Sequence, residues 1–288
     1  MKNSKIFKLH FYTIKIDDSL FNTSKNKIID LMKLLNTGKK PTNVYELNGY
    51  KAFIKPISNN IYCFEKHRMD DLPPVGNINN DKERHLNLKN GETLIEKNYF
   101  FINKELGYIV YQEKNEGFRA STLSLYFHFL LGEDTSKIEI SQILKTTAYQ
   151  RLAKYGYLKG MEISFASPSN DMLKDFGISL TNRIMYQKNK NMNVSVKVSL
   201  SKKDSYSKEF IRGILNTYNK YSDKISLFKL KGSETEKGSL EDINLANDVI
   251  ESVADVRIDK SHIVEDDMIN ALTHANTVHE DELKKLLK

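Results

Sequence analysis

The sequence predicts an α+β protein built from two mixed α/β domains, with antiparallel or mixed sheets and C-terminal helices. Segments that alternate apolar and polar residues, as half-buried strands do, recur along the chain. Between them lie segments with apolar residues at helical spacing, several of which end at a glycine. The chain has 288 residues. Since a domain usually has about 150 residues, two domains are expected.

The N-terminal domain is expected to span residues 1–136 and to form a small α+β unit. The segment Asp70–Asn90 contains Pro73, Pro74 and Gly76 among polar residues, so a long loop is predicted there. The predicted elements are a strand at Ile6–Ile16, a helix that starts at Asn22, Thr23 or Ser24 and ends at Gly38, strands at Val44–Ile57, Asn60–Glu65, Thr93–Ile102 and Gly107–Gln112, and a helix from Ser121 or Thr122 to Leu131.

The C-terminal domain is expected to span residues 137–288. From residue 138 to residue 231 strands and helices alternate, which favours an α/β or split α+β domain. The predicted elements are strands at Lys137–Leu144, Tyr157–Ala166, Asn193–Leu200, Ser226–Lys231 and Val253–Ile258, and helices at Thr146–Tyr155, from Ser167 or Ser169 to Met185, and at Tyr206–Tyr218, Glu265–Ala275 and Glu280–Leu287. A polar loop is predicted at Gly232–Gly238.

The distribution of charge is the most informative property of the sequence. Lysine and arginine number 44, and aspartate and glutamate 37, which gives a formal net charge of +7. The net charge is +4 for residues 1–136, +11 for residues 137–231 and −8 for residues 232–288. A basic block followed by an acidic block favours a polyanion as partner, although two solvated faces that neutralise each other give the same pattern. The order of the blocks also predicts that the acidic one competes with the polyanion.

Composition excludes several classes of protein. The 40% hydrophobic and 28% charged residues are typical of a globular chain rather than a disordered or fibrous one. No run approaches the roughly 18 consecutive apolar residues of a membrane span, and lysines interrupt the apolar start of the chain, unlike a signal peptide. Cys63 is the single cysteine, which excludes a disulfide framework and a cysteine-rich zinc site. These features predict a cytoplasmic protein without direct membrane insertion.

Searches for catalytic motifs identify no site. No phosphate-binding loop, dinucleotide fingerprint, nucleophile elbow or zinc-protease helix is present. His274 and His279 are not spaced to share one helical face, and His128 is interpreted as a core histidine. Cys63 is interpreted as a small buried side chain. We expect no catalytic residue, no metal and no cofactor. A metal-dependent nuclease that uses carboxylates of the basic block is the alternative.

The cations of the basic block are the candidate nucleic-acid-binding residues. They are Lys145, Arg151, Lys154, Lys159, Arg183, Lys188, Lys190, Lys197, Lys202, Lys203, Lys208 and Arg212. Long cations bind phosphates without reading the bases, and no helix-turn-helix, zinc-finger or aromatic RNA-binding signature is present. DNA binding with weak sequence preference is therefore expected. An adaptor whose basic face binds an acidic protein is a further alternative.

Short strings in both halves resemble a known family. They are Asn48–Phe53, Ile61–Phe64, Leu106–Val110 and Thr122–Leu131 in the first half, and Glu162–Phe165, Leu173–Gly177, Val194–Leu200 and Ile225–Leu230 in the second. Through these strings and the order of its elements, the chain resembles the RexA phage-exclusion proteins of temperate phages. The segment Asp70–Asn90 is longer than in that family, and the loop at Gly232–Gly238 departs from it.

The resemblance implies a function and partners. RexA-like proteins are similar in fold to the recombination-associated RdgC protein, and they are two-domain homodimers that bind DNA without marked sequence preference. They act in phage exclusion and in the lysogeny switch, and they offer no catalytic residues to carry over. The resemblance thus implies a DNA-binding homodimer of a prophage or anti-phage defence system, with a membrane-protein partner encoded nearby. Other two-domain phage-defence effectors, such as the DNA-binding subunit of Kiwa, are a related alternative.

Overall fold

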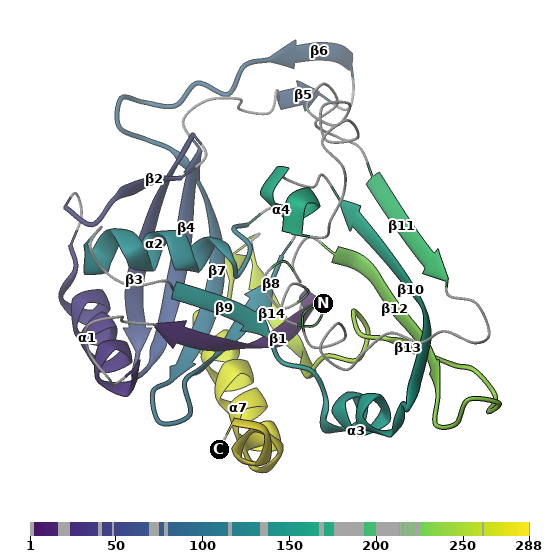
Figure 1. The fold of residues 1–288 in the computed structure, drawn as a ribbon. Coiled ribbons are helices and arrows are strands. Elements are labelled where there is room, and N and C mark those ends of the chain that lie inside the picture. The colour runs from purple at the N-terminus through teal and green to yellow at the C-terminus, as the bar shows by residue number, and fades with distance from the viewer. Residues whose placement is uncertain are drawn as a thin grey trace. The chain divides into compact units, whose positions relative to one another are not determined.

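The computed structural model describes most of the chain, which forms two compact units. Unit 1 comprises Met1–Leu9, Ile14–Ile138 and Ser252–Lys288, and unit 2 comprises His10–Thr13 and Glu139–Glu251. The described residues are 3–16, 24–39, 42–47, 49–68, 75–77, 80–114, 117–132, 138–166, 170–175, 193–199, 213, 215, 218, 221, 225–260 and 262–287. The first strand, β1 (Ser4–Ile16), contributes residues to both units (Figure 1).

Unit 1 is built on a large sheet. Its strands are β1, β2 (Tyr45–Leu47), β3 (Tyr50–Ser58), β4 (Ile61–Arg68), β7 (Leu94–Asn103), β8 (Tyr108–Glu113), β14 (Glu251–Asp259) and β15 (His262–Ile263). They lie in the order β15-β14-β1-β8-β7-β4-β3-β2, and β9 (Ile138–Gln142) pairs with β1 as well. A separate two-stranded sheet consists of β5 (Val75–Asn77) and β6 (Asn80–Arg84).

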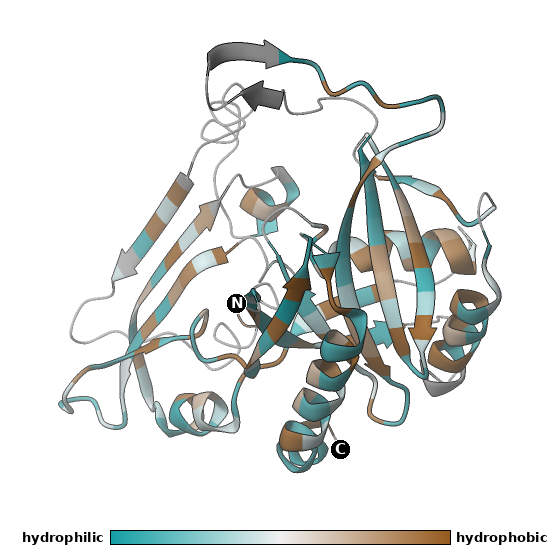
Figure 2. Cartoon of the chain, turned by 180° about the vertical axis from the view of Figure 1, so that it is seen from behind, coloured by the Kyte–Doolittle hydropathy of each residue, from teal (hydrophilic) through white to brown (hydrophobic). Residues whose placement is uncertain are grey.

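Helices cover both faces of the unit 1 sheet. α1 (Ser24–Thr37) packs against β3, and α2 (Thr122–Leu131) packs against β2 and α1, whereas α7 (Glu265–Leu287) packs against β7 and β8. Figures 1 and 2 show α1 and α2 on one face and α7 on the other. Strand β4 is therefore buried on both sides along Ile61–Lys66. Burial of both faces explains why apolar and polar residues do not alternate there.

Unit 2 is a smaller antiparallel sheet with helices. Its elements after β9 are α3 (Thr146–Lys154), β10 (Tyr157–Ala166), α4 (Asn170–Asp175), β11 (Asn193–Ser199), β12 (Ile225–Ser233) and β13 (Glu241–Asn244). The strands lie in the order β11-β10-β12-β13, and every neighbouring pair is antiparallel. Leu215, Tyr218 and Tyr221 have helical backbone, and Tyr218 and Tyr221 join the core together with Phe165 and Phe228.

The predicted α+β class is confirmed, and strand Tyr157–Ala166 has the bounds that its alternation predicts. Two segments of the N-terminal half differ from the prediction. The strand expected at Val44–Ile57 is the hairpin β2–β3, because Gly49 adopts a φ of +80°, which favours glycine and turns the chain. The loop expected at Asp70–Asn90 contains β5 and β6.

The C-terminal segment also differs from the prediction. The two helices expected at Glu265–Ala275 and Glu280–Leu287 are one continuous helix, α7, since no glycine or proline interrupts Asn276–His279. Ser252–Lys288, expected in the C-terminal domain 137–288, belongs to unit 1 because β14 pairs with β1 and α7 packs on that sheet. Parts of the helices predicted from Ser167 or Ser169 to Met185 and at Tyr206–Tyr218 lie outside the described residues.

Candidate functional site

The solvent face of the unit 2 sheet is the candidate site, and the register of its strands defines it. Ile163 of β10 pairs with Val196 of β11 and Phe228 of β12, and these side chains pack in the core. Successive side chains of a strand point to opposite faces. The residues next to them, such as Glu162 and Lys197, therefore lie on the other face. Figure 2 shows hydrophobic and hydrophilic residues alternating along these strands.

A row of charged side chains crosses the middle of this face. Glu162 of β10 lies between Lys197 of β11 and Lys229 of β12. The Lys197 ammonium is 3.7 Å from the Glu162 carboxylate, and the lysine side chain is 72% exposed. An exposed ion pair of this kind contributes at most about 1 kcal/mol. Lys197 can therefore exchange this carboxylate for another anion.

The neighbouring rows combine one more lysine with small residues. Gly160 lies opposite Lys231 of β12, which is exposed and in turn lies opposite Asp242 of β13. On the other side of the charged row, the Ser164 hydroxyl is hydrogen-bonded to the Ser195 hydroxyl at 3.0 Å. The same row contains Leu227 of β12, which lies opposite Ser164. The lysines are thus flanked by three small residues, Gly160, Ser164 and Ser195, and by one leucine, and Lys197 and Lys231 are exposed to an approaching polyanion.

One of the predicted binding residues at α3, Arg151, is held by contacts within unit 2. Both Arg151 guanidinium nitrogens are engaged: one donates to the Asp242 carbonyl at 2.7 Å, and the other is 3.5 Å from the Asp248 carboxylate. Lys145 precedes the helix, half-buried, and its backbone N–H donates to the Asp248 carbonyl. Lys154 at the end of the helix is exposed. Arg151 therefore joins α3 to the chain around β13, and Lys154 is the accessible cation of this group.

The hairpin β12–β13 is anchored to α3 by a second contact. The Tyr155 hydroxyl donates to the Glu241 carbonyl at 3.0 Å, and burial raises the pKa of Tyr155 to about 12. The hydroxyl therefore remains a donor throughout the physiological range of pH. Glu241 and Asp242 consequently lie at fixed positions on β13, in register with Gly232 and Lys231.

Lys159 does not meet the requirement of an accessible cation, although the sequence places it among the candidates. Only 8% of this residue is exposed, and its ammonium lies 5.4 Å from the centre of the Tyr157 ring. Lys159 is two residues from Met161 and four from Ile163, which pack toward the core, so alternation along β10 places it on the same face as these two residues. Its burial follows from this position in the strand.

Seven of the predicted cations lie outside the described residues, namely Arg183, Lys188, Lys190, Lys202, Lys203, Lys208 and Arg212. Sequence analysis missed Lys229 and Lys231, which share the solvent face with Lys197. The signal was present, because both alternate with the core residues Phe228 and Leu230 on β12.

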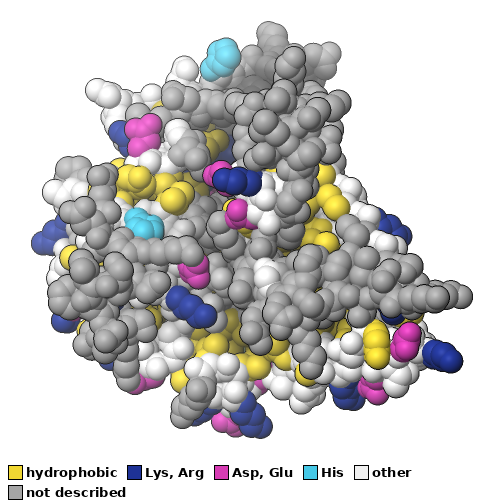
Figure 3. All heavy atoms as spheres, viewed as in Figure 1, with side chains coloured by type: hydrophobic (Ala, Val, Ile, Leu, Met, Phe, Trp, Pro, Cys, Tyr) yellow, Lys and Arg dark blue, Asp and Glu magenta, His cyan; other side chains and the backbone are white. Residues whose placement is uncertain are grey.

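Charge differs between the two units. Unit 2 contains 18 basic and 13 acidic side chains, whereas unit 1 contains 26 and 24. On the face drawn in Figure 3, basic and acidic side chains of the described residues are interspersed. The unit division thus leaves the net charge of unit 2 at +5, lower than the +11 of residues 137–231, because part of the acidic block folds with it.

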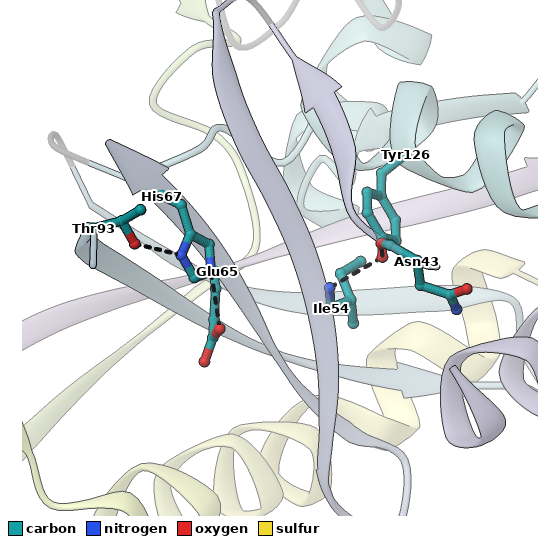
Figure 4. Close-up of polar contacts among 6 residues, drawn as sticks. All are labelled: Asn43, Ile54, Glu65, His67, Thr93 and Tyr126. Carbon is teal, nitrogen blue, oxygen red and sulfur yellow. Dashed lines mark hydrogen bonds and ion pairs between the residues drawn. The ribbon is translucent and has the colours of Figure 1, made fainter. Parts of the chain in front are cut away.

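A polar chain in unit 1 was not predicted. His67 on β4 has Nδ1 at 2.8 Å from the Thr93 hydroxyl and Nε2 at 3.2 Å from the Glu65 carboxylate (Figure 4). Glu65 and His67 are two residues apart on one strand and so share a face. The contacts join β4 to the residue that precedes β7. A carboxylate–imidazole–hydroxyl chain also resembles the arrangement that activates a hydroxyl nucleophile, so these residues are the ones to replace if catalysis is detected.

Within the described ranges, no group of three or more histidine, cysteine, aspartate or glutamate side chains is arranged to hold a metal ion. Cys63 is buried, and burial together with nearby Glu65 raises the pKa of its thiol to about 12, as expected for an inert side chain. None of the helices that the structure describes is long and apolar enough to cross a membrane. Comparison with known protein families and with curated proteins finds no match.

Proposed function

We propose that this protein binds DNA without marked sequence preference through the solvent face of the unit 2 sheet. The observation that carries the proposal is the placement of Lys197, Lys229 and Lys231 on one face of β11 and β12, within the segment of net charge +11. Such cations neutralise phosphates and carry no base recognition. The proposed cellular role, exclusion of phages by a prophage or defence locus, rests on the resemblance to RexA proteins.

The test is a binding titration of duplex DNA at two salt concentrations, with and without magnesium. Two exposed lysines of the face are neutralised together, Lys197→Gln and Lys231→Gln. The control neutralises two exposed lysines of unit 1, Lys89→Gln and Lys104→Gln, which changes the net charge by the same amount. Both pairs lie at the surface, so the folding of each variant should match that of the parent.

The expected result is specific to the unit 2 pair. Each lost phosphate contact lowers the slope of log K against log salt by about 0.9, so two contacts correspond to roughly a 60-fold loss of affinity at 0.1 M salt. The control pair should bind within about threefold of the parent, since diffuse charge acts only over a Debye length. Equal losses in both variants contradict the assignment to unit 2. Magnesium-dependent cleavage supports the nuclease instead, and the absence of any DNA complex supports the adaptor.

The cellular role has its own test. Cells that express the parent should plate a challenging phage less efficiently than cells that express the Lys197→Gln, Lys231→Gln variant. The unit 1 control variant should protect as the parent does. Equal plating on all three strains contradicts a role in phage exclusion, and it leaves the DNA-binding measurement unaffected.

A further inference from the structure

The solvent face of the unit 2 sheet carries a carboxylate among its lysines. Strand β10 lies between β11 and β12 (Figure 1), and Glu162 of β10 is in register with Lys197 on one side and with Lys229 on the other. The Glu162 side chain is 31% exposed. A phosphate placed over β10 therefore meets a negative charge, whereas a phosphate placed over β11 or β12 meets a lysine.

Glu162 has only small neighbours along its own strand. The residues that share this face of β10 with it are Gly160 and Ser164, two positions to either side. Glu162 is therefore the side chain of β10 that projects furthest between the lysines. Lys231, the next residue of β12 on this face, lies opposite Gly160. The face thus has cations along both flanks and an anion in its middle.

The sheet fixes the distance between the two flanks. Neighbouring strands lie about 4.8 Å apart, so the backbones of β11 and β12 are about 9.6 Å apart at Lys197 and Lys229. Duplex DNA carries its phosphates on two strands, and the minor groove between them is about 6 Å wide. With one phosphate strand at Lys197 and the other at Lys229 and Lys231, the groove lies over Glu162 and no phosphate approaches the carboxylate.

A single strand cannot meet this pattern in the same way. Its phosphates follow one line, so a strand that contacts both Lys197 and Lys229 has to cross β10 and bring a phosphate close to Glu162. A strand that follows β12 alone avoids the carboxylate but loses Lys197. Proteins that hold single strands also stack the bases on aromatic side chains, and the described positions of this face on β10, β11 and β12 hold none.

We infer that Glu162 makes the proposed DNA site selective for duplex DNA over single strands. The carboxylate repels a phosphate over the middle of the sheet and leaves the two flanks to the phosphate strands of a duplex. The inference rests on the proposed function, since it concerns the same face and the same lysines. Glu162 is thus a specificity residue of that site, and the duplex replaces its ion pair with Lys197.

The test compares a short duplex with each of its separated strands, by fluorescence anisotropy at low salt. The parent should bind the duplex more tightly. Glu162→Gln should tighten single-strand binding by up to about fivefold, as expected for the loss of one exposed charge contact, and duplex binding by less than about twofold. Glu162→Asp keeps the charge and should keep the preference. The control Glu46→Gln removes an equal charge from unit 1, where Glu46 lies exposed opposite Lys51, and should leave the preference unchanged.

Equal tightening of duplex and single strand by Glu162→Gln, no tightening of either, or a parent without preference for the duplex overturns the inference. Failure of the proposed function shows differently, as an unchanged affinity of the Lys197→Gln, Lys231→Gln variant for duplex DNA. If that double variant loses affinity while Glu162→Gln keeps the full preference, the face binds DNA but Glu162 does not select the duplex. Circular dichroism of Glu162→Gln should match the parent spectrum, because the substitution conserves shape and lies at the surface.

Discussion

Replacing Tyr126 by phenylalanine should destabilise unit 1 although the ring and its packing are retained. The Tyr126 hydroxyl accepts the Ile54 N–H at 3.2 Å and donates to the Asn43 carbonyl at 2.6 Å (Figure 4). Strand β2 pairs with only the first residues of β3, up to Ala52. Continuing that register places Asn43 opposite Ile54. The hydroxyl therefore replaces the next rung of the ladder, joining two backbone groups that no longer meet directly.

The magnitude follows from the burial of these groups. Tyr126 is completely buried, and Ile54 is 2% exposed, so its N–H cannot turn to water after the substitution. Leaving a buried donor without a partner costs about 1–3 kcal/mol. We expect the free energy of unfolding to fall by about 2 kcal/mol. With an m value of about 3 kcal/mol/M, the midpoint of urea unfolding should decrease by about 0.7 M.

The assay is urea unfolding combined with hydrogen exchange. Tyr149→Phe is the control, because Tyr149 is 40% exposed and its substitution should change stability by less than about 0.5 kcal/mol. The Ile54 amide should exchange faster in Tyr126→Phe than in the parent, and more so than amides at the centre of β4. If Tyr126→Phe unfolds at the same urea concentration as the parent, the hydroxyl does not bridge the two backbone groups and this account of the β2–β3 junction is refuted.

Three further predictions concern titration and charge. Burial raises the pKa of the Cys63 thiol to about 12, so roughly one molecule in ten thousand has the thiolate at pH 8. An aromatic disulfide reagent should therefore react with Cys63 only after denaturation. Prompt reaction of the native protein would contradict the burial of this thiol. Burial also raises the pKa of Tyr62 and of Tyr108 to about 12, so the neutral forms stabilise the fold below pH 10, and this contribution is lost as the pH rises from 10 toward 12. The free energy of unfolding, measured by urea titration, should be lower at pH 11.5 than at pH 9, by up to about 1.4 kcal/mol for each tyrosine and each pH unit above 10, and equal free energies contradict this. Asp242→Asn should tighten DNA binding severalfold at low salt, because Asp242 lies opposite Lys231, with a smaller gain at high salt; an unchanged affinity at low salt shows that Asp242 does not compete with DNA.

Local patterns predicted the single elements well. The alternation in Tyr157–Ala166 and the glycine after Leu131 mark the ends that β10 and α2 have in the structure. The β2–β3 hairpin was missed because both strands are partly buried, so only Gly49 signals the turn. The assignment of Ser252–Lys288 to unit 1 depends on pairing between β14 and β1, about 250 residues apart in the chain. Local sequence patterns contain no information about such a contact.

The candidate site was predicted only in part. Clustering of lysine and arginine in the sequence led to unit 2, and it identified Lys197 and Lys154, which are exposed. It could not separate these from Arg151, whose guanidinium is bound to the chain around β13, or from Lys159, which lies on the core face of β10. Those distinctions depend on tertiary hydrogen bonds and on strand register rather than on composition.

The salt dependence of DNA affinity tests the central claim most directly. Fluorescence anisotropy with two unrelated duplexes of equal length should give equal dissociation constants, and log K should fall linearly with log salt. Neutralising Lys197 and Lys231 together should make that slope shallower by about 1.8 for both duplexes. A slope that is unchanged in this double variant, or an affinity that differs strongly between the two duplexes, contradicts phosphate binding by the solvent face of the unit 2 sheet.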